Sequence, residues 1–272
     1  MAEVRRMRPL LGTYVEIGAI GAGASVQCAV NEAFSVIEEI HASLSFQDPG
    51  SELSRLNKKP GQWVSMSRTG LRALKLALVM GVASGERFNC AVGGQMVRWG
   101  TLPDHTGDER IAIGNAQDIE IRAGAARLRR AVLVTLDGIA KGFAVDRAID
   151  MLIRYGVSSG WVNAGGDLRV YGDKRLEVMR REVDGSLQPL GLLHNGAMAS
   201  SYTGGQGGND LPGRIAGSAT QSTDAGRVVS VIARSAWRAD ALTKVAAATA
   251  ANEQSLLVSG LGGTVVTTGL YP

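Results

Sequence analysis

The sequence has few cysteines and few histidines, and these shortages exclude several kinds of site. Its two cysteines, Cys28 and Cys90, are too few for a disulfide framework and lack metal-site spacing. The three histidines lie far apart, with no cysteine or carboxylate at ligand spacing, which argues against a zinc site. Cys28 falls in a predicted amphipathic helix, where we expect it to be a small core residue.

Long apolar runs are missing as well. No stretch reaches the roughly 18 apolar residues that a membrane-spanning helix needs. The first residues, MAEVRRMRPLLGTYVEIG, are basic and then alternate in polarity, so they lack the apolar core of a secretory signal. We therefore expect a cytoplasmic protein without a membrane span.

Aromatic residues make up only 5% of the chain, although its net charge is +4. Nucleic-acid binding combines clustered basic residues with aromatic side chains that stack on bases. Here the arginine clusters are scattered, near residues 5–8, 127–130 and 180–181. We expect no nucleic-acid partner; a solvated basic surface is the first interpretation and an anionic small molecule the second.

Helices and strands are predicted in mixed order along the 272 residues. An apolar period of 3.6 residues predicts helices over 24–44, 67–83 and 139–155, a further helix over 240–251, and a short one after Ser51. Strands are predicted at 10–17, 161–171, 175–188 (a hairpin turning at 184–185) and 228–233, with three or so within 111–138 and two within 255–269. Residues 203–227, rich in Gly, Ser and Thr, are expected to be a mobile loop. This order favours one α+β domain over 1–272, with mixed or antiparallel sheets packed with helices.

The segment LDGIAKGFAVD places Lys141 between Gly138 and Gly142 at a predicted helix start. Backbone N–H groups at a helix start favour an anion, and a lysine adds a positive charge. The alternative is a surface lysine whose stem covers a core helix. The segment alone favours the surface lysine.

Two further segments have the same ambiguity. WVNAGGDLRVYG contains a glycine pair that lets a ligand approach the backbone, flanked by Asn163 and Asp167; a β-bulge is the structural alternative. SAWRADALTKVAAATA places Asp240 in the first turn of the predicted helix, with Thr243 one turn later. Oxygen atoms at that spacing suit Mg²⁺, and a plain helix cap is the alternative.

Seven segments together, in this order, resemble the ApbE family of FAD:protein FMN transferases, of which the chain would be a short, divergent member. They run across nearly the whole chain: RMRPLLGTYVEI, SFQDPGSELSRLN, RFNCAVGGQMVRWG, LDGIAKGFAVDRAIDMLIRYGV, WVNAGGDLRVYG, MASSYTGG and VVSVIARSAWRADALTKVAA. The resemblance implies a T-fold-like α+β enzyme, monomeric or homodimeric. It would bind FAD with Mg²⁺, transfer FMN to a Thr or Ser hydroxyl of an acceptor protein, and release AMP.

The resemblance also assigns roles to individual residues. Lys141 and Asp240 would be catalytic, and Lys141 would also contact FAD. The metal would be held by Gly138 through its backbone, Asp240 and Thr243. The other positions implied to bind the cofactor are Leu11, Phe46, Phe88, Asn89, Cys90, Thr135 and Ile215.

The chain departs from the family pattern at several of these positions. Arg214 stands where a histidine is usual, Asn89 replaces an aspartate, and Thr135 occupies a position that is often acidic. Lys244 stands where a threonine metal ligand is often found, and its charge could oppose a metal. Two alternatives to a transferase therefore remain: an FAD hydrolase that forms FMN and AMP, and a flavin-binding protein without catalysis.

Overall fold

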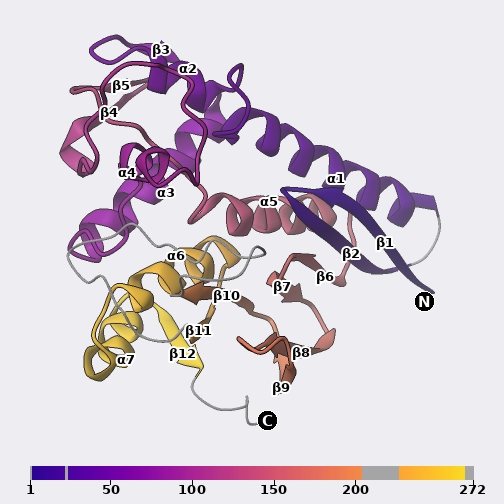
Figure 1. Cartoon of the computed structure of the whole chain (residues 1–272). Helices are drawn as coiled ribbons and strands as arrows, with labels where there is room; N and C mark the ends of the chain where they lie inside the picture. Colours follow the sequence, from indigo (N-terminus) through magenta and orange to yellow (C-terminus); the bar gives the residue numbers. More distant parts are fainter. Residues whose placement is uncertain (1, 22–23, 204–226, 267–272) are drawn as a thin grey trace.

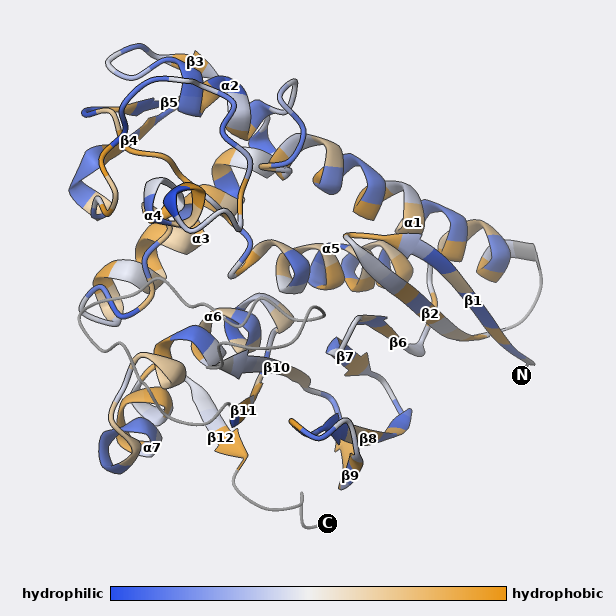
Figure 2. Ribbon diagram, in the orientation of Figure 1, coloured by the Kyte–Doolittle hydropathy of each residue, from blue (hydrophilic) through white to orange (hydrophobic). Residues whose placement is uncertain are grey.

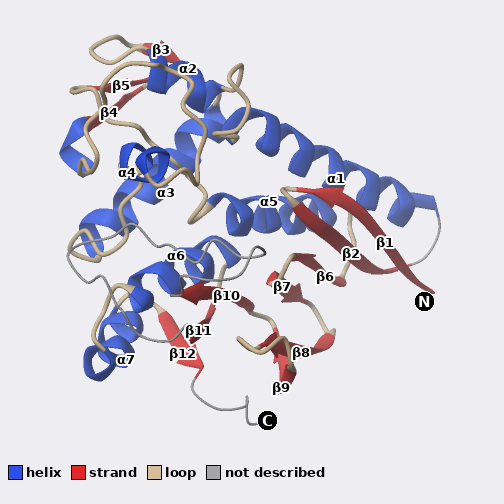
Figure 3. Ribbon diagram, in the orientation of Figure 1, coloured by secondary structure: helices blue, strands red, loops and turns tan. Residues whose placement is uncertain are grey.

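The computed structural model describes residues 2–21, 24–203 and 227–266, and a seven-stranded antiparallel sheet is its largest element (Figures 1 and 3). The strands are β1 (Ala2–Leu10), β2 (Thr13–Gly21), β6 (Ser159–Ala164), β7 (Asp167–Tyr171), β10 (Ala197–Thr203), β11 (Arg227–Ala233) and β12 (Gly263–Val266). They lie side by side in the order β1-β2-β6-β7-β10-β11-β12. The α+β architecture predicted from the sequence is thus confirmed.

Four helices accompany this sheet: α1 (Ala24–Leu44), α5 (Ala140–Arg154), α6 (Ala236–Ala247) and α7 (Ala251–Gly260). Helix α5 packs against α1 on one side and α6 on the other, and α6 packs on β10 and β11 (Figure 1). The apolar stripe of α5, which includes Phe143, Ile149 and Leu152, is fully buried. This packing brings the start of α5 beside α6.

The remaining elements form a group next to one end of α1 and α5 and a separate hairpin (Figure 3). The group contains α2 (Glu52–Lys58), α3 (Arg68–Ala83), α4 (Gly93–Arg98), a 3₁₀ turn (Ala116–Asp118), and β3 (Val64–Ser65), β4 (Ile119–Arg122) and β5 (Ala125–Leu128). Its three strands pair in the order β3-β5-β4. The hairpin joins β8 (Arg175–Arg181) to β9 (Leu187–His194).

One large hydrophobic cluster includes buried residues from both the sheet, such as Val15 and Val231, and the α2–α4 group, such as Leu53 and Leu74. A second, smaller cluster joins Trp161 and other sheet residues to the β8–β9 hairpin. Orange apolar segments in Figure 2 occur in both regions. Since the large cluster crosses from one region to the other, the sheet and the α2–α4 group share this core.

Several predicted elements are confirmed closely. Helix α1 has the predicted bounds, Ser67 caps α3 by accepting a hydrogen bond from Gly70, and Ser51 caps α2 in the same way. The β8–β9 hairpin turns at the predicted Asp184 and Gly185. No helix in the described ranges is long and apolar enough to cross a membrane.

Other predictions were wrong. The strand expected at 10–17 is two strands, because Leu11 and Gly12 form a tight turn between β1 and β2. The stretch 161–171, predicted as a strand broken by the glycine pair, is interrupted at that pair, which forms the turn of a hairpin. The first of the two strands expected within 255–269 is the end of α7, and only β4 and β5 occur as strands within 111–138. Cys28 is exposed on α1 and is not a core residue.

Candidate active site

The start of α5 and the middle of α6 meet at Asp240, whose side chain is fully buried. Asp240 Oδ2 accepts a hydrogen bond from the backbone N–H of Gly142, at 3.1 Å. That N–H lies in the first turn of α5, where backbone donors have no partner within the helix. Ile139, the residue before α5, provides no side-chain cap, so Asp240 acts as one from a different helix.

Gly142 allows this approach because it has no side chain. A Cβ atom there would lie 2.3 Å from the carbonyl oxygen of Ala236, the first residue of α6. The contact predicted by the sequence between the Lys141 segment and the Asp240 segment is therefore present. It is made through the backbone beside Lys141.

Asp240 was predicted in the first turn of its helix, and that placement was wrong. Helix α6 begins at Ala236, so Asp240 lies in the second turn. The start of α6 is capped by Asp146 of α5, which accepts hydrogen bonds from the backbone N–H groups of Ala236 (3.0 Å) and Trp237 (2.8 Å). The two helices therefore cap each other, Asp146 from α5 and Asp240 from α6.

Lys141 forms an ion pair with Asp167, the residue after the glycine pair of the β6–β7 turn. The Lys141 Nζ to Asp167 Oδ2 distance is 3.2 Å, and the side chains are 37% and 2% exposed, respectively. The orientation is poor for a hydrogen bond, and Asp167 Oδ2 accepts none from the part of the chain that the structure describes. This ion pair connects the segment WVNAGGDLRVYG, which contains Asp167, to the segment LDGIAKGFAVD, which contains Lys141.

Burial and neighbouring charges shift the pKa values of this pair. Loss of hydration, followed by the negative charge of Asp240, raises the pKa of Asp167 to about 6, against the opposing effect of Lys141. The charge of Asp167 is in turn the largest effect raising the pKa of Lys141. Lys141 is therefore a firmly charged ammonium group, and because part of its side chain is exposed, an anion can reach it.

Lys244 and Asp137 complete a cluster of charged side chains with Lys141, Asp167 and Asp240, which we call the charged cluster. Lys244 Nζ lies 2.5 Å from Asp240 Oδ1, and the Lys244 side chain is 20% exposed. Loss of hydration, and to a lesser extent the negative charge of Asp240, raises the pKa of Asp137. Asp137 as a whole residue is exposed, so water around it makes this increase in pKa smaller. With every group ionised, the cluster holds three carboxylates and two ammonium groups.

Thr243 was predicted as a metal ligand through its hydroxyl. That hydroxyl is fully buried, donates to the Asp240 carbonyl oxygen at 2.7 Å, and lies 2.7 Å from the Ser201 hydroxyl of β10. Within the described residues, no group of three or more His, Cys, Asp or Glu side chains is arranged to hold a metal ion. The oxygen atoms of Asp240 and Thr243 that were expected to bind a metal thus form hydrogen bonds with protein groups.

Two neighbouring segments beside the charged cluster contain four of the residues predicted to bind the cofactor. These residues are Phe88, Asn89, Cys90 and Thr135. A Cβ atom at Gly138 would lie 3.2 Å from Cε2 of Phe88, so the aromatic ring packs against the turn before α5. Thr135 N donates to the Cys90 carbonyl oxygen at 2.9 Å. Burial raises the pKa of Cys90 to about 12, which makes this thiol unreactive.

Asn89 has a structural role in this arrangement. Its amide donates to the Gly114 carbonyl oxygen and accepts from the Ala91 N–H, both at 2.8 Å. Asn57 makes a similar pair of hydrogen bonds with the backbone of Val134. Sequence reasoning missed Asn57 and Asp146, because no local pattern shows that a polar side chain bonds a backbone far along the chain.

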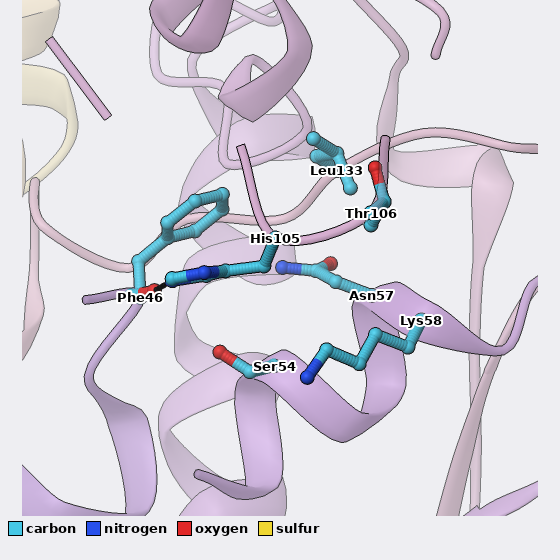
Figure 4. A pocket seen from close by; sticks show the side chains of 7 residues that line it. All are labelled: Phe46, Ser54, Asn57, Lys58, His105, Thr106 and Leu133. Atoms are coloured by element: carbon cyan, nitrogen blue, oxygen red, sulfur yellow. Dashed lines mark hydrogen bonds between the residues drawn. The ribbon is translucent and has the colours of Figure 1, made fainter. Parts of the chain in front are cut away.

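Phe46 lines a small pocket in the α2 region, and none of the side chains that line it belongs to the charged cluster (Figure 4). Its ring stacks with that of His105, and the imidazole Nε2 lies 2.9 Å from the Phe46 carbonyl oxygen. The other lining residues are Ser54, Asn57, Lys58, Thr106 and Leu133. Only Phe46 and Leu133 among the seven lining side chains are apolar, and the other five are polar or charged.

Leu11 lies in the turn between β1 and β2 with φ of 56°, a conformation that is uncommon for residues other than glycine. This turn neighbours the β6–β7 turn, since Gly165 packs against Thr13 and donates to the Tyr14 carbonyl oxygen. Leu11 and Asp167 are therefore at the same end of the sheet. The described residues do not include Ile215, Arg214 or most of the predicted loop 203–227.

The ApbE family model matches residues 11–265 of the chain, a span that contains every described element except β1 and the last residue of β12. The chain belongs to the ApbE family. The resemblance inferred from its seven segments is thus confirmed.

Two curated relatives are named FAD:protein FMN transferase. The protein from Treponema pallidum (strain Nichols) is 27% identical over 201 residues, and that from Vibrio cholerae serotype O1 is 25% identical over 189 residues. The matches cover 66% and 64% of this chain but 56% of each relative. The chain thus matches little more than half the length of these relatives.

Solved structures share the fold over almost the whole chain. An ApbE protein from Thermotoga maritima superposes with a TM-score of 0.81 at 22% identity, covering 97% of this chain and 93% of that one. The flavin transferase ApbE from Vibrio cholerae gives 0.77 at 21% identity, covering 94% and 90%. The apo flavinyl transferase ApbE from Pseudomonas stutzeri gives 0.79 at 19% identity, covering 98% and 94%.

Proposed function

We propose that this protein is an FAD:protein FMN transferase, which moves FMN from FAD to a Thr or Ser hydroxyl of an acceptor protein and releases AMP. Membership of the ApbE family and two relatives named for this activity support the proposal. The observation that carries it is the meeting of the three predicted segments in one charged cluster, around Lys141, Asp167 and Asp240.

The reaction makes one bond and breaks one bond at phosphorus. The acceptor hydroxyl oxygen attacks the phosphorus on the FMN side and loses its proton to solvent, the bond to the bridging oxygen breaks, and AMP leaves with that oxygen. Negative charge on the pyrophosphate must be neutralised during this step. Lys141 has the position and the permanent charge for that role, and the neighbouring N–H groups at the start of α5 favour an anion.

The remaining site assignments belong to the same proposal. Phe46 would contact one of the aromatic rings of FAD, and Leu11, Phe88 and Thr135 would shape the binding site from neighbouring turns. Asn89 and Cys90 would act indirectly, since Asn89 braces the backbone and Cys90 is buried. Ile215 is retained as a contact to the isoalloxazine. A cytoplasmic monomer or homodimer is also proposed, which cell fractionation and size-exclusion chromatography would test.

Magnesium is the one implied group that the residues do not fit. Of the three metal ligands expected from the resemblance, Asp240 and Thr243 already form hydrogen bonds with protein groups. The partner of Asp240 Oδ1 is the ammonium group of Lys244. A Mg²⁺ ion requires a nearly octahedral set of free oxygen ligands. We therefore assign no step of the transfer to a metal.

The transfer is tested by incubating the protein with FAD and a candidate flavin-acceptor protein, with and without Mg²⁺. The expected products are an acceptor whose mass has increased by one FMN unit and an equal amount of AMP. AMP and free FMN without acceptor modification would indicate the hydrolase alternative. FAD binding without any AMP would indicate the flavin-binding alternative, and no binding would reject all three.

A further inference from the structure

Both carboxylate oxygens of Asp240 already have a partner in the protein, and one of these partners is a positive charge. Oδ2 accepts from the backbone N–H of Gly142, and Oδ1 is 2.5 Å from Lys244 Nζ, while the side chain as a whole is fully buried. A Mg²⁺ ion would bind a carboxylate oxygen at about 2.1 Å. An ion on Oδ1 would therefore lie close to the Lys244 ammonium, and at such a distance, away from bulk water, two positive charges repel strongly.

The stem of Lys244 also occupies the region between the residues expected to hold a metal. A Cβ atom at Gly138 would be 3.6 Å from both Cγ and Cε of Lys244, so the stem passes directly over that turn. Lys244 follows Asp240 by four residues, which places both side chains on the same face of α6. One lysine thus contacts both Gly138 and Asp240.

We propose that the Lys244 ammonium takes the place of a divalent cation in this protein and meets the pyrophosphate of FAD, so that FAD binds without Mg²⁺. The inference rests on the proposed function only in taking FAD as the ligand. An ammonium group has three N–H donors, and one of them is used by Asp240. The Lys244 side chain is 20% exposed, so the head group is held from inside by Asp240 and is still accessible to an anion.

Asp240 and Gly142 fix the position of this charge. Because Asp240 caps α5 through Gly142 N, its carboxylate cannot move without releasing the start of that helix. Lys141 lies one residue before Gly142, so the two ammonium groups approach the same helix start from α5 and α6. They form a pair of fixed positive charges suited to the two phosphate groups of FAD.

The test measures FAD binding by the full chain from flavin fluorescence, in EDTA and in excess Mg²⁺. The wild type is expected to have the same Kd in both within about twofold. The variant Lys244→Met retains the stem without the charge, and its Kd in EDTA should rise about tenfold or more, the usual effect of losing a charge-assisted hydrogen bond. Lys244→Thr frees Asp240 and adds a hydroxyl, so excess Mg²⁺ should restore binding in that variant.

Two controls keep the result interpretable. Lys174→Met removes an ammonium group that pairs with Glu3 outside the charged cluster, and it should bind FAD like the wild type. Lys244→Arg retains a positive charge and should still bind FAD in EDTA, which covers the case in which Lys244→Met does not fold. Circular dichroism of each variant identifies any loss of structure.

Either of two results would overturn the inference and leave the proposed function intact. One is wild-type FAD binding that disappears in EDTA and returns with Mg²⁺. The other is a folded Lys244→Met variant that binds FAD in EDTA as tightly as the wild type. A wild-type protein that binds no FAD in either buffer contradicts the proposed function itself, and the inference with it.

Discussion

At the scale of single residues, the charge of Asp167 depends strongly on the fold. Its side chain is 2% exposed, its Oδ2 faces Lys141, and its pKa is raised to about 6. The folded protein therefore holds a proton on Asp167 at pH values where the unfolded chain has already released it. For this group alone, stability is greatest below the unfolded pKa and decreases as the pH rises towards 6.

The variant Asp167→Asn tests this directly, because an amide does not ionise. We expect the free energy of unfolding of the variant, relative to the wild type, to increase by about 3 kcal/mol between pH 4 and pH 7, since one pKa unit corresponds to about 1.4 kcal/mol. Urea unfolding at several pH values measures the difference. A difference that is constant across this range would show that the pKa of Asp167 is not raised in the fold.

Residue types alone revealed only part of the site. Lys141 and Asp240 could be selected because each lies in a segment with the composition of an anion or metal site, beside Gly138 and Thr243. That Asp240 binds Lys244 and a backbone N–H depends on the start of α6 and on how closely α5 approaches it. Such distances depend on packing between residues about 100 positions apart, which no local pattern encodes.

At the scale of elements, the reciprocal caps between α5 and α6 hold the site together. Asp146 bonds two N–H groups of α6 and pairs with Arg169 of β7 at 2.6 Å, so one carboxylate connects two helices and a strand. Burial raises the pKa of Asp146, and Arg169 opposes that effect. Losing this carboxylate leaves buried donors without partners.

Replacing Asp146 by Ala should lower the free energy of unfolding by about 3 kcal/mol, the combined effect of losing a helix cap and breaking a buried ion pair. Asp150 is the matched control on the same helix, one turn later. It pairs with Arg147 and its side chain is 43% exposed, so Asp150→Ala should change stability by less than about 0.5 kcal/mol. Equal effects of the two substitutions in urea unfolding would contradict the capping role of Asp146.

Sequence patterns found the helices with wide apolar stripes and missed elements without one. Helix α1 buries a continuous stripe and was predicted to the residue, whereas α7 buries only Gln254 and Val258, and its apolar run resembled a strand. Strand β1 is an edge strand exposed along most of its length, so it lacks the alternation that identifies β2. A helix or strand shows a periodic apolar pattern in the sequence only where one of its faces is buried.

At the scale of the whole molecule, the shared core connects the α2–α4 group to the large sheet. The cluster that contains Leu53 and Leu74 of the group also contains Val231 of β11 and Ala246 of α6. The segment 132–136 runs between the regions with its residues buried, held by Asn57 at Val134. If either region unfolded, it would expose apolar surface of the other, and the free energy of that exposure opposes separate unfolding.

The chain should therefore unfold in one transition, as a single domain over 1–272 requires. Trp63 and Trp99 lie in the α2–α4 group, and Trp161 and Trp237 lie in β6 and α6, so the four tryptophans report on both regions. In one double variant Trp63 and Trp99 become Phe, and in the other Trp161 and Trp237 do. In each double variant, the urea midpoint measured by fluorescence should equal the midpoint measured by far-ultraviolet circular dichroism. Comparing the two signals within one variant corrects for any change in stability that the substitutions cause. If the fluorescence midpoint departs from that of circular dichroism, with opposite signs in the two variants, the regions unfold separately and the shared core does not couple them.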